Sequence, residues 1–334
     1  MSSLFFCVIF RKHNNRYSLS KALCLEKFNT KAGRNMKNSD VLVVPKDRSL
    51  YFFPAISEIT VCSGKEILAA SNDQLRRYLK DFQLIIFLDF GFETEMAAKI
   101  RPFTKAKIVL FFWNHFKLEH YRKLNAAQKE PAIDEIYHFD PLEARDLGLK
   151  HNSSFYTQSV GEPLHNTEYD IFFGANDNGR KQQAMELKGR FESLGLSTFY
   201  HILPKRGNEQ EGYLPYGDYL NLVKRSKGIL EILRAGQYGV TLRTFESLFL
   251  QKKLVTANEM LPFYRMYDPR NVFMIETDLS QLTAFLNIPY QPADQAMLDF
   301  FEAKNWVKRF IDYDPKLFEE FEYYPELMKH ESAL

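Results

Sequence analysis

Short apolar runs that alternate with amphipathic segments constrain the fold of this chain more than any other feature. A strand, a helix and a second strand at this spacing form a parallel βαβ unit, because parallel strands need a crossover connection between them. In the first half of the chain we predict strands at residues 40–44, 58–62, 84–89 and 107–113, with helices at residues 71–82 and 93–103.

The second half repeats the alternation after a polar stretch that contains Gly and Pro, and we place a domain boundary near residues 158–168. Strands are predicted at residues 171–174, 197–203, 228–233, 252–256 and 271–276, and helices begin near Lys181, Tyr216, Thr241 and Ser280. The expected fold is α/β, with two Rossmann-like domains facing a cleft and a C-terminal helical segment. The expected divisions are residues 1–160, residues 161–311 and an acidic tail at residues 312–334.

Length and composition fit a folded two-domain protein, since the chain has 334 residues of which 45% are hydrophobic. Cys7, Cys24 and Cys62 are odd in number and lack metal-ligand spacing, so we expect no disulfide frame or zinc site, and a reducing compartment such as the cytoplasm. The apolar run at residues 4–10 is too short to span a bilayer and precedes its basic residues, so we interpret it as a buried strand.

Charge is distributed unevenly, with a basic surplus in residues 1–160 and an acidic surplus in residues 161–334. The asymmetry is either a passive surface property or the sign of an anionic partner for the first half. The basic and aromatic run at residues 101–123 favours peripheral contact with an anionic membrane. We expect no nucleic-acid partner.

The stretch "GQYGVTLRTFESLFLQKKLVT", residues 236–256, raises the central question about function. Apolar residues at helical spacing give the helix after Thr241 a buried face. Arg243 and Glu246 lie on the face of this helix that the apolar residues do not occupy. That face is either solvated, with Thr241 a plain N-cap and the two charges a surface pair, or it holds a ligand.

Three stretches carry a resemblance to a known family: "DEIYHFDPLEARDLGLKHNSSFY", "YDIFFGANDNGRKQQAMELKGRFESLG" and "GQYGVTLRTFESLFLQKKLVTAN". Together they resemble bacterial lipopolysaccharide or exopolysaccharide biosynthesis glycosyltransferases of the GT-B architecture, over residues 84–276. The resemblance implies a cytoplasmic enzyme that moves a sugar from a nucleotide-sugar co-substrate to a growing glycan. It implies that residues 161–311 bind the donor and residues 1–160 the glycan or lipid-linked acceptor.

The helix start suits a donor diphosphate, because its free N–H groups and partial positive charge attract anions. Arg243 can neutralise phosphate charge, and the resemblance implies that Glu246 accepts hydrogen bonds from the ribose hydroxyls. A second loop, at the end of the strand "YDIFFG", can hold the donor from the other side or be an ordinary turn. The predicted donor-binding residues are Gly174, Arg180, Gln237, Gly239, Val240, Thr241, Arg243 and Glu246.

Two residues in the first half are candidates for the base that deprotonates the acceptor hydroxyl in an inverting transfer. Asp89 follows one predicted strand and His115 follows the next, so both lie at the carboxyl edge of a parallel sheet. The alternatives are that Asp89 caps a turn and that His115 starts a helix.

We expect no metal, because the candidate phosphate ligands are N–H groups and cations. The only DxD-like pair, Asp312 and Asp314, lies in the acidic tail. Neither a G-x-G-x-x-G nor a P-loop lysine motif is present. Glu231 lies farther from Glu246 than the paired glutamates of many retaining GT-B enzymes, so the stereochemistry stays open. A nucleotide-sugar epimerase and a non-catalytic GT-B subunit are the alternative functions.

Overall fold

The computed structural model describes residues 40–45, 59–161, 163, 166–204, 214–233, 237 and 239–331. The strand expected at residues 4–10, and Cys7 and Cys24, lie outside these residues. The chain divides into two compact units. Of the described residues, unit 1 holds those from Asp40 to Ser154 together with Ala303–Asp314, and unit 2 holds those of Phe155–Glu302 together with residues 315–331.

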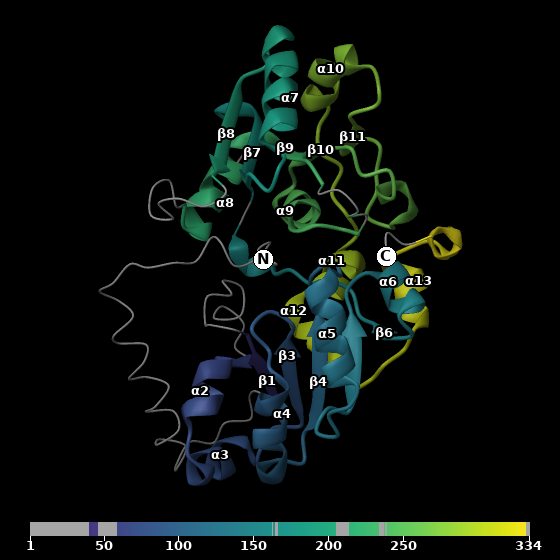
Figure 1. Ribbon diagram of the computed structural model, residues 1–334. Coiled ribbons are helices and arrows are strands. Elements are labelled where there is room, and N and C mark those ends of the chain that lie inside the picture. Colours follow the sequence, from purple (N-terminus) through teal and green to yellow (C-terminus); the bar gives the residue numbers. More distant parts are fainter. Residues whose placement is uncertain are drawn as a thin grey trace. The chain divides into compact units, whose positions relative to one another are not determined.

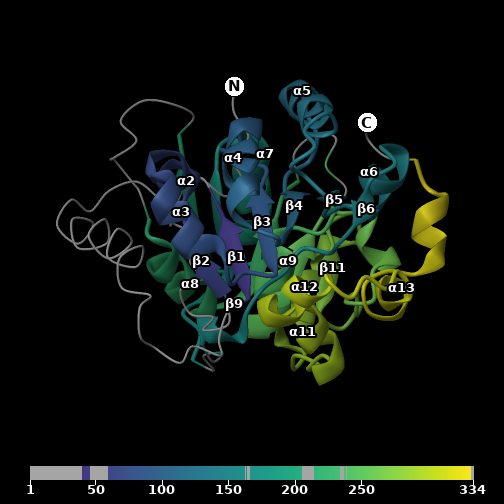
Figure 2. The same cartoon turned by 90° about the horizontal axis from the view of Figure 1, so that it is seen from below.

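Unit 1 contains, among the described residues, a sheet of six parallel strands. Figure 2 shows their order, with β2 at one edge and β6 at the other. The strands, in sheet order, are β2 (Ile59–Val61), β1 (Val41–Val44), β3 (Leu84–Leu88), β4 (Lys107–Phe112), β5 (Glu135–His138) and β6 (Lys150–His151). The carboxyl ends of all six strands therefore meet at one edge of the sheet.

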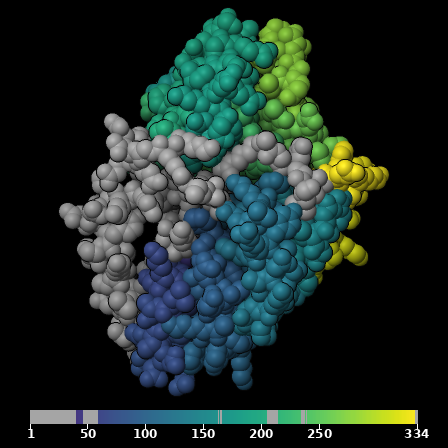
Figure 3. All heavy atoms as spheres, viewed as in Figure 1, coloured from purple at the N-terminus to yellow at the C-terminus, as the bar shows by residue number. Residues whose placement is uncertain are grey.

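One face of this sheet is covered by the helices that follow the strands. Alternate strand residues such as Ile85, Phe87 and Leu110 pack with the buried side chains of these helices in one hydrophobic core. The helices are α2 (Gly64–Ala69), α3 (Asn72–Leu79), α4 (Thr94–Ile100) and α5 (Leu118–Ala127); α6 (Pro141–Asp146) lies between β5 and β6. In the space-filling view the blue residues of unit 1 form one continuous surface (Figure 3).

The other face of the unit 1 sheet is covered by residues from the C-terminal part of the chain. Trp306 of α12 (Ala303–Lys308) lies with its ring centroid 5.2 Å from that of Phe111, and Phe310 lies 4.8 Å from Tyr137. Arg309 donates to Asn152 Oδ1 at 2.8 Å. Residues 303–311, which we expected in the second domain, thus belong to unit 1, because they bury its second sheet face.

Unit 2 contains a sheet of five parallel strands among its described residues. The strands, in sheet order, are β11 (Val272–Met274), β10 (Lys253–Thr256), β9 (Ser226–Glu231), β7 (Tyr169–Asn176) and β8 (Thr198–Leu203). Strand β7 runs two residues past Gly174, the expected end of this strand, because Ala175 and Asn176 still pair with β8. The order reverses around β7, since β8 pairs on one side of it and β9 on the other.

Helices cover both faces of the unit 2 sheet (Figure 1). Phe173 packs with α7 (Lys181–Ser193) and α10 (Leu282–Asn287), and its neighbour Phe172 points the other way, to Tyr219 of α8 (Tyr216–Lys224). Helix α9 (Leu242–Leu250) joins β9 to β10. The last helices of the unit are α11 (Gln295–Phe301) and α13 (Lys316–Phe321), and the segment expected to be an acidic tail packs through Phe318 and Leu327. Among the described residues, no helix is both long and apolar enough to cross a bilayer.

Candidate functional site

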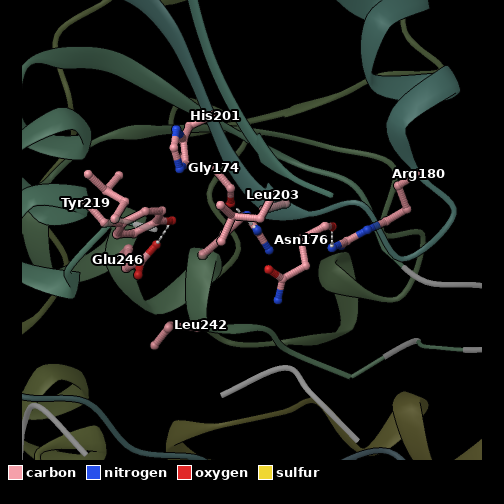
Figure 4. A pocket seen from close by; sticks show the side chains of 11 residues that line it. Gly174, Asn176, Arg180, His201, Leu203, Tyr219, Leu242 and Glu246 are labelled. Atoms are coloured by element: carbon pink, nitrogen blue, oxygen red, sulfur yellow. Dashed lines mark hydrogen bonds between the residues drawn. The ribbon is translucent and has the colours of Figure 1, made fainter. Parts of the chain in front are cut away.

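A pocket lies in unit 2 at the carboxyl ends of β7 and β8, beside the start of α9 (Figure 4). This is the point where the strand order reverses, and open parallel sheets bind their ligands at such points. The pocket is lined by Gly174, Ala175, Asn176, Arg180, His201, Leu203, Leu214, Tyr219, Leu242, Arg243 and Glu246. Four predicted donor-binding residues therefore come together here: Gly174, Arg180, Arg243 and Glu246.

Helix α9 is buried along almost its whole length. Thr241 is its N-cap, and its hydroxyl oxygen accepts from the Arg243 N–H at 3.1 Å. Every residue from Arg243 to Leu250 is buried. A solvated face with a surface pair of Arg243 and Glu246 is thus ruled out, although Thr241 does cap the helix.

Glu246 is fully buried and its carboxylate is held by two tyrosines of α8. The Tyr216 hydroxyl donates to Oε1 at 2.9 Å, and the Tyr219 hydroxyl donates to Oε2 at 2.7 Å. Figure 4 shows Tyr219 and Glu246 pointing toward each other. Burial raises the pKa of Glu246 to about 7, even though both tyrosines and the Arg243 charge favour the ionised form.

This raised pKa predicts a stability that depends on pH. The folded state keeps the proton up to about pH 7, whereas the unfolded chain loses it near 4.5, so folding is favoured most below pH 4.5 and less as pH rises through 7. From pH 5 to pH 8 the free energy of unfolding of the wild type should fall by about 2–3 kcal/mol relative to Glu246→Gln. Urea unfolding of both proteins across this range measures the difference. The exposed control Glu186→Gln should follow the wild type, and parallel curves for wild type and Glu246→Gln would contradict the prediction.

Arg243 is also buried, with 6% of its surface exposed, and it contacts the strand that Gly174 occupies. Its guanidinium donates to the Gly174 carbonyl oxygen and lies 5.7 Å from the centroid of the Phe173 ring. Arg180 makes a similar link, since it donates to the carbonyl oxygens of Ile232 at 2.6 Å and Asn176 at 2.9 Å. The guanidinium groups of Arg243 and Arg180 therefore bind backbone carbonyl oxygens near the ends of β7 and β9, beside the pocket.

Gly174 is needed because the Tyr219 ring occupies the space of a side chain. A Cβ atom at this position would lie 2.5 Å from Tyr219 and 2.7 Å from Phe172. Gly174→Ala should therefore lower the free energy of unfolding by about 1–3 kcal/mol. The control Gly189→Ala, in α7 with nothing within 4 Å, should raise it by up to about 1 kcal/mol. Equal melting temperatures for Gly174→Ala and wild type would show that Tyr219 moves freely.

Glu231, which the sequence singled out only for its distance from Glu246, fixes the start of α9. It is fully buried at the end of β9. Its Oε1 accepts from the hydroxyls of Thr241 and Thr244, and its Oε2 accepts from Thr256 at 2.5 Å. The hydroxyls of three threonines thus donate to one carboxylate. The sequence could not predict this cluster, because the threonines come together only when β9 and β10 lie side by side.

The remaining predicted donor-binding residues lie on the segment before α9 and do not line this pocket. Gly239 and Val240 are buried. Gln237 is partly buried, and its Oε1 has no hydrogen-bond partner among the described residues. Tyr219 and His201 are lining residues that sequence reasoning missed, because neither stands in a glycine-rich or charged context.

In unit 1, Asp89 follows β3 and its side chain is only 1% exposed. Oδ1 accepts from the Trp113 N–H at 2.9 Å, and Oδ2 accepts from Asn114 Nδ2 at 2.9 Å. His120 Nε2 lies 3.7 Å from Oδ2. The carboxylate joins the ends of β3 and β4, so its contacts favour a structural role over proton transfer.

His115 lies after β4, and its side chain is 22% exposed. Its Nδ1 contacts Oε1 of Glu143 in α6, a residue that the sequence did not single out. Glu143 Oε2 lies 3.1 Å from His138 Nε2. Burial acts to raise the pKa of Glu143, but the His115 hydrogen bond and the His138 contact lower it below its usual value.

In the part of the chain that the structure describes, no three His, Cys, Asp or Glu side chains come together in a group that could hold a metal ion. Asp312 and Asp314 are exposed.

Comparisons with known proteins give matches only among solved structures. No protein-family model matches the sequence, and no curated protein matches it. An alpha-glucosyltransferase, solved in complex with UDP and a 13-mer DNA containing a central A:G mismatch, matches with a TM-score of 0.50 and 13% identity. The match covers 80% of this chain and 94% of that chain. At this identity the likeness shows the fold alone.

Two further structures match less well and carry no argument about this chain. The GtfA/B complex has 9% identity and a TM-score of 0.39, over 78% of this chain and 57% of that chain. A UDP-forming alpha,alpha-trehalose-phosphate synthase from Burkholderia xenovorans has 11% identity and a TM-score of 0.37, over 84% and 97%. The architecture is therefore α/β with two parallel, Rossmann-like sheets and C-terminal helices, like that of GT-B glycosyltransferases, and this confirms the predicted fold class.

Proposed function

We propose that this chain is a GT-B-type glycosyltransferase that moves a sugar from a nucleotide-sugar donor to a glycan or lipid-linked acceptor. The observation that carries the proposal is the pocket of unit 2, where Arg243 and Glu246 reach the reversal point of a parallel sheet from one helix. A GT-B-like fold shared with a glucosyltransferase solved with UDP supports the same class of donor.

Each part of the donor has a partner in this scheme. Gly239, Val240 and Thr241 do not line the pocket, and we propose that the diphosphate reaches beyond the lining to the segment before α9, where the N–H groups of these residues meet it. Arg243, which does line the pocket, adds positive charge. Glu246 accepts from the ribose hydroxyls. Each of its oxygens has two lone pairs, so one tyrosine bond per oxygen leaves a position for the ligand.

The reaction follows from these roles. The acceptor hydroxyl oxygen attacks C1 of the donor sugar, and the bond from C1 to the diphosphate oxygen breaks with its electron pair on the nucleoside diphosphate. If the configuration at C1 inverts, a base takes the hydroxyl proton, and His115 is the more exposed of the two candidates. Helix dipole and Arg243 stabilise the leaving group without a metal.

The setting we propose is bacterial surface polysaccharide assembly at the inner face of the cell membrane. The basic surplus of residues 1–160 supports an anionic surface as partner, and Leu118 at the start of α5 is 71% exposed beside Lys117 and Arg122. Binding to anionic vesicles should then weaken as salt is raised. Co-sedimentation that does not change with salt would remove the electrostatic part of this proposal.

The experiment that tests the function is a thermal-shift screen against UDP, GDP, CMP and dTDP sugars in the presence of EDTA. A donor at a hundred times its Kd should stabilise the protein by about 2.7 kcal/mol. The stabilising donor is then incubated with glycan acceptors, and the products are identified. A transferase releases free nucleotide and lengthens the glycan.

The alternatives give different products. An epimerase returns an altered nucleotide sugar, and a non-catalytic GT-B subunit binds the donor without turnover. If no nucleotide sugar shifts the melting temperature, the proposed function is wrong. If turnover needs added magnesium or manganese, its metal-independent form is wrong.

A further inference from the structure

We propose that Glu143 is a positioning residue that holds the proton of neutral His115 on Nδ1, so that Nε2 is the atom that accepts a proton from the acceptor hydroxyl. The acceptor part of this inference rests on the proposed function. The tautomer part rests on the contacts of unit 1 alone.

The chain places Glu143 and His115 side by side through the ends of two neighbouring strands. Asp140, after β5, is the N-cap of α6, and its Oδ1 accepts from the Leu142 N–H at 2.9 Å and the Glu143 N–H at 3.1 Å. Glu143 is therefore fixed in the first turn of α6. Because β4 and β5 are paired in parallel, this turn lies beside the loop after β4 that carries His115.

The second oxygen of Glu143 shows which way the protons point. Oε2 accepts from the Phe116 N–H at 3.1 Å and lies 3.1 Å from His138 Nε2. His138 Nε2 faces two acceptors, Glu143 Oε2 and the Asn114 carbonyl oxygen at 3.2 Å, so it bears a proton and donates to them. Its Nδ1 lies 3.0 Å from the Asp140 nitrogen and 3.2 Å from the Asp140 carbonyl oxygen, and in a neutral ring with Nε2–H it accepts from the Asp140 N–H. Oε2 of Glu143 therefore accepts from two N–H donors.

With Oε2 occupied by donors, Glu143 is an ionised acceptor, and its lowered pKa agrees with this. Its Oε1 then takes a proton-bearing nitrogen, which is Nδ1 of His115. A neutral imidazole carries one proton, so Nε2 keeps its lone pair. Within the described residues no side chain or backbone group pairs with Nε2, and the 22% exposure of His115 leaves the ring open to a reactant.

In the transfer, Nε2 takes the hydroxyl proton as the acceptor oxygen bonds to C1 and the nucleoside diphosphate leaves. The imidazolium that forms lies against the Glu143 carboxylate, which stabilises it until the proton passes to solvent. The other ionisable groups near Glu143 are Asp140 and Tyr121. Neither forms a hydrogen bond or ion pair with His115 within the described residues, so Glu143 is the group that orients the ring.

The test uses the full chain labelled with ¹⁵N-histidine, with ¹H–¹⁵N spectra recorded at a pH where His115 is neutral. His115→Ala assigns the His115 signals by their loss. In the wild type we expect protonated Nδ1 and bare Nε2. In Glu143→Gln we expect the Nε2–H form to rise to half or more, while the exposed control Glu95→Gln leaves the spectrum unchanged. Protonated Nε2 in the wild type, or an unchanged tautomer in Glu143→Gln, would overturn the inference.

Kinetics supply a second readout once a donor and acceptor are known. Glu143→Gln should lower kcat about 10–100-fold with little change in the donor KM, and should move the acid limb of the pH–rate profile. Glu143→Asp, which keeps the charge on a shorter side chain, should restore part of the rate. If Glu143→Gln does not fold, the wild-type spectrum and Glu143→Asp decide the question. A protein without transferase activity that shows the expected tautomer would refute the proposed function and leave the positioning role intact.

Discussion

His115→Ala should lower kcat by about 10²–10⁴-fold and leave the Kd for the donor within about twofold of the wild type. The expected loss is large because general-base catalysis acts in the transition state, whereas His115 belongs to unit 1 and the proposed donor pocket to unit 2. Single-turnover rates at saturating donor, together with calorimetric Kd values, measure the two quantities separately. His330→Ala, an exposed histidine of unit 2, is the matched control and should behave as the wild type.

Asp89→Asn should, in contrast to His115→Ala, lower the stability of the fold and change kcat little. Its carboxylate accepts from Trp113 and Asn114, so an amide in its place turns one acceptor into a donor facing donors. We expect a loss of about 1–3 kcal/mol in the free energy of unfolding and a change in kcat of only a few fold. If Asp89→Asn instead loses turnover a hundredfold at unchanged stability, and His115→Ala does not, then Asp89 is the base.

The strands and the fold class could be predicted because hydrophobic periodicity reports local structure directly. The runs at residues 84–88 and 108–113 are apolar throughout, as is typical of strands buried on both faces, and they match β3 and β4. Hydrophobic periodicity does not show which distant residues a buried side chain packs against. Trp306 and Phe310 lie in the C-terminal segment that we expected to be helical, but their packing partners, Phe111 and Tyr137, lie far away along the chain.

The candidate site could be predicted in part, for a related reason. Arg243 and Glu246 were found because they stand out from an apolar helical stripe. Their burial was not predicted, because it depends on α8, whose Tyr216 and Tyr219 satisfy the Glu246 carboxylate. Glu143 was missed because its relation to His115 exists only where β4 and β5 lie side by side.

Substitution of Glu246 and of Arg243 should affect the binding of different parts of the donor, the nucleoside and the diphosphate. Glu246→Ala removes hydrogen bonds to the ribose, so both the free nucleoside and the nucleoside diphosphate should bind about 10–150-fold more weakly, a loss of about 1.5–3 kcal/mol. Arg243→Ala removes charge beside the phosphates, so the nucleoside diphosphate should lose a similar factor and the nucleoside much less. Calorimetric titration of each variant with both ligands gives the four values.

Because both side chains are buried, the fold must be checked in each variant before its affinity is interpreted. Arg243→Lys keeps a positive charge and should recover part of the diphosphate affinity, which a purely structural contact with Gly174 would not predict. Glu186→Ala and Arg190→Ala remove the same charges from the exposed side of α7 in the same unit and should bind as the wild type. Folded variants of Glu246 and Arg243 that keep wild-type affinity for both ligands would mean that the two residues only hold α9 against β7. In that case a donor, if one binds, must lie elsewhere.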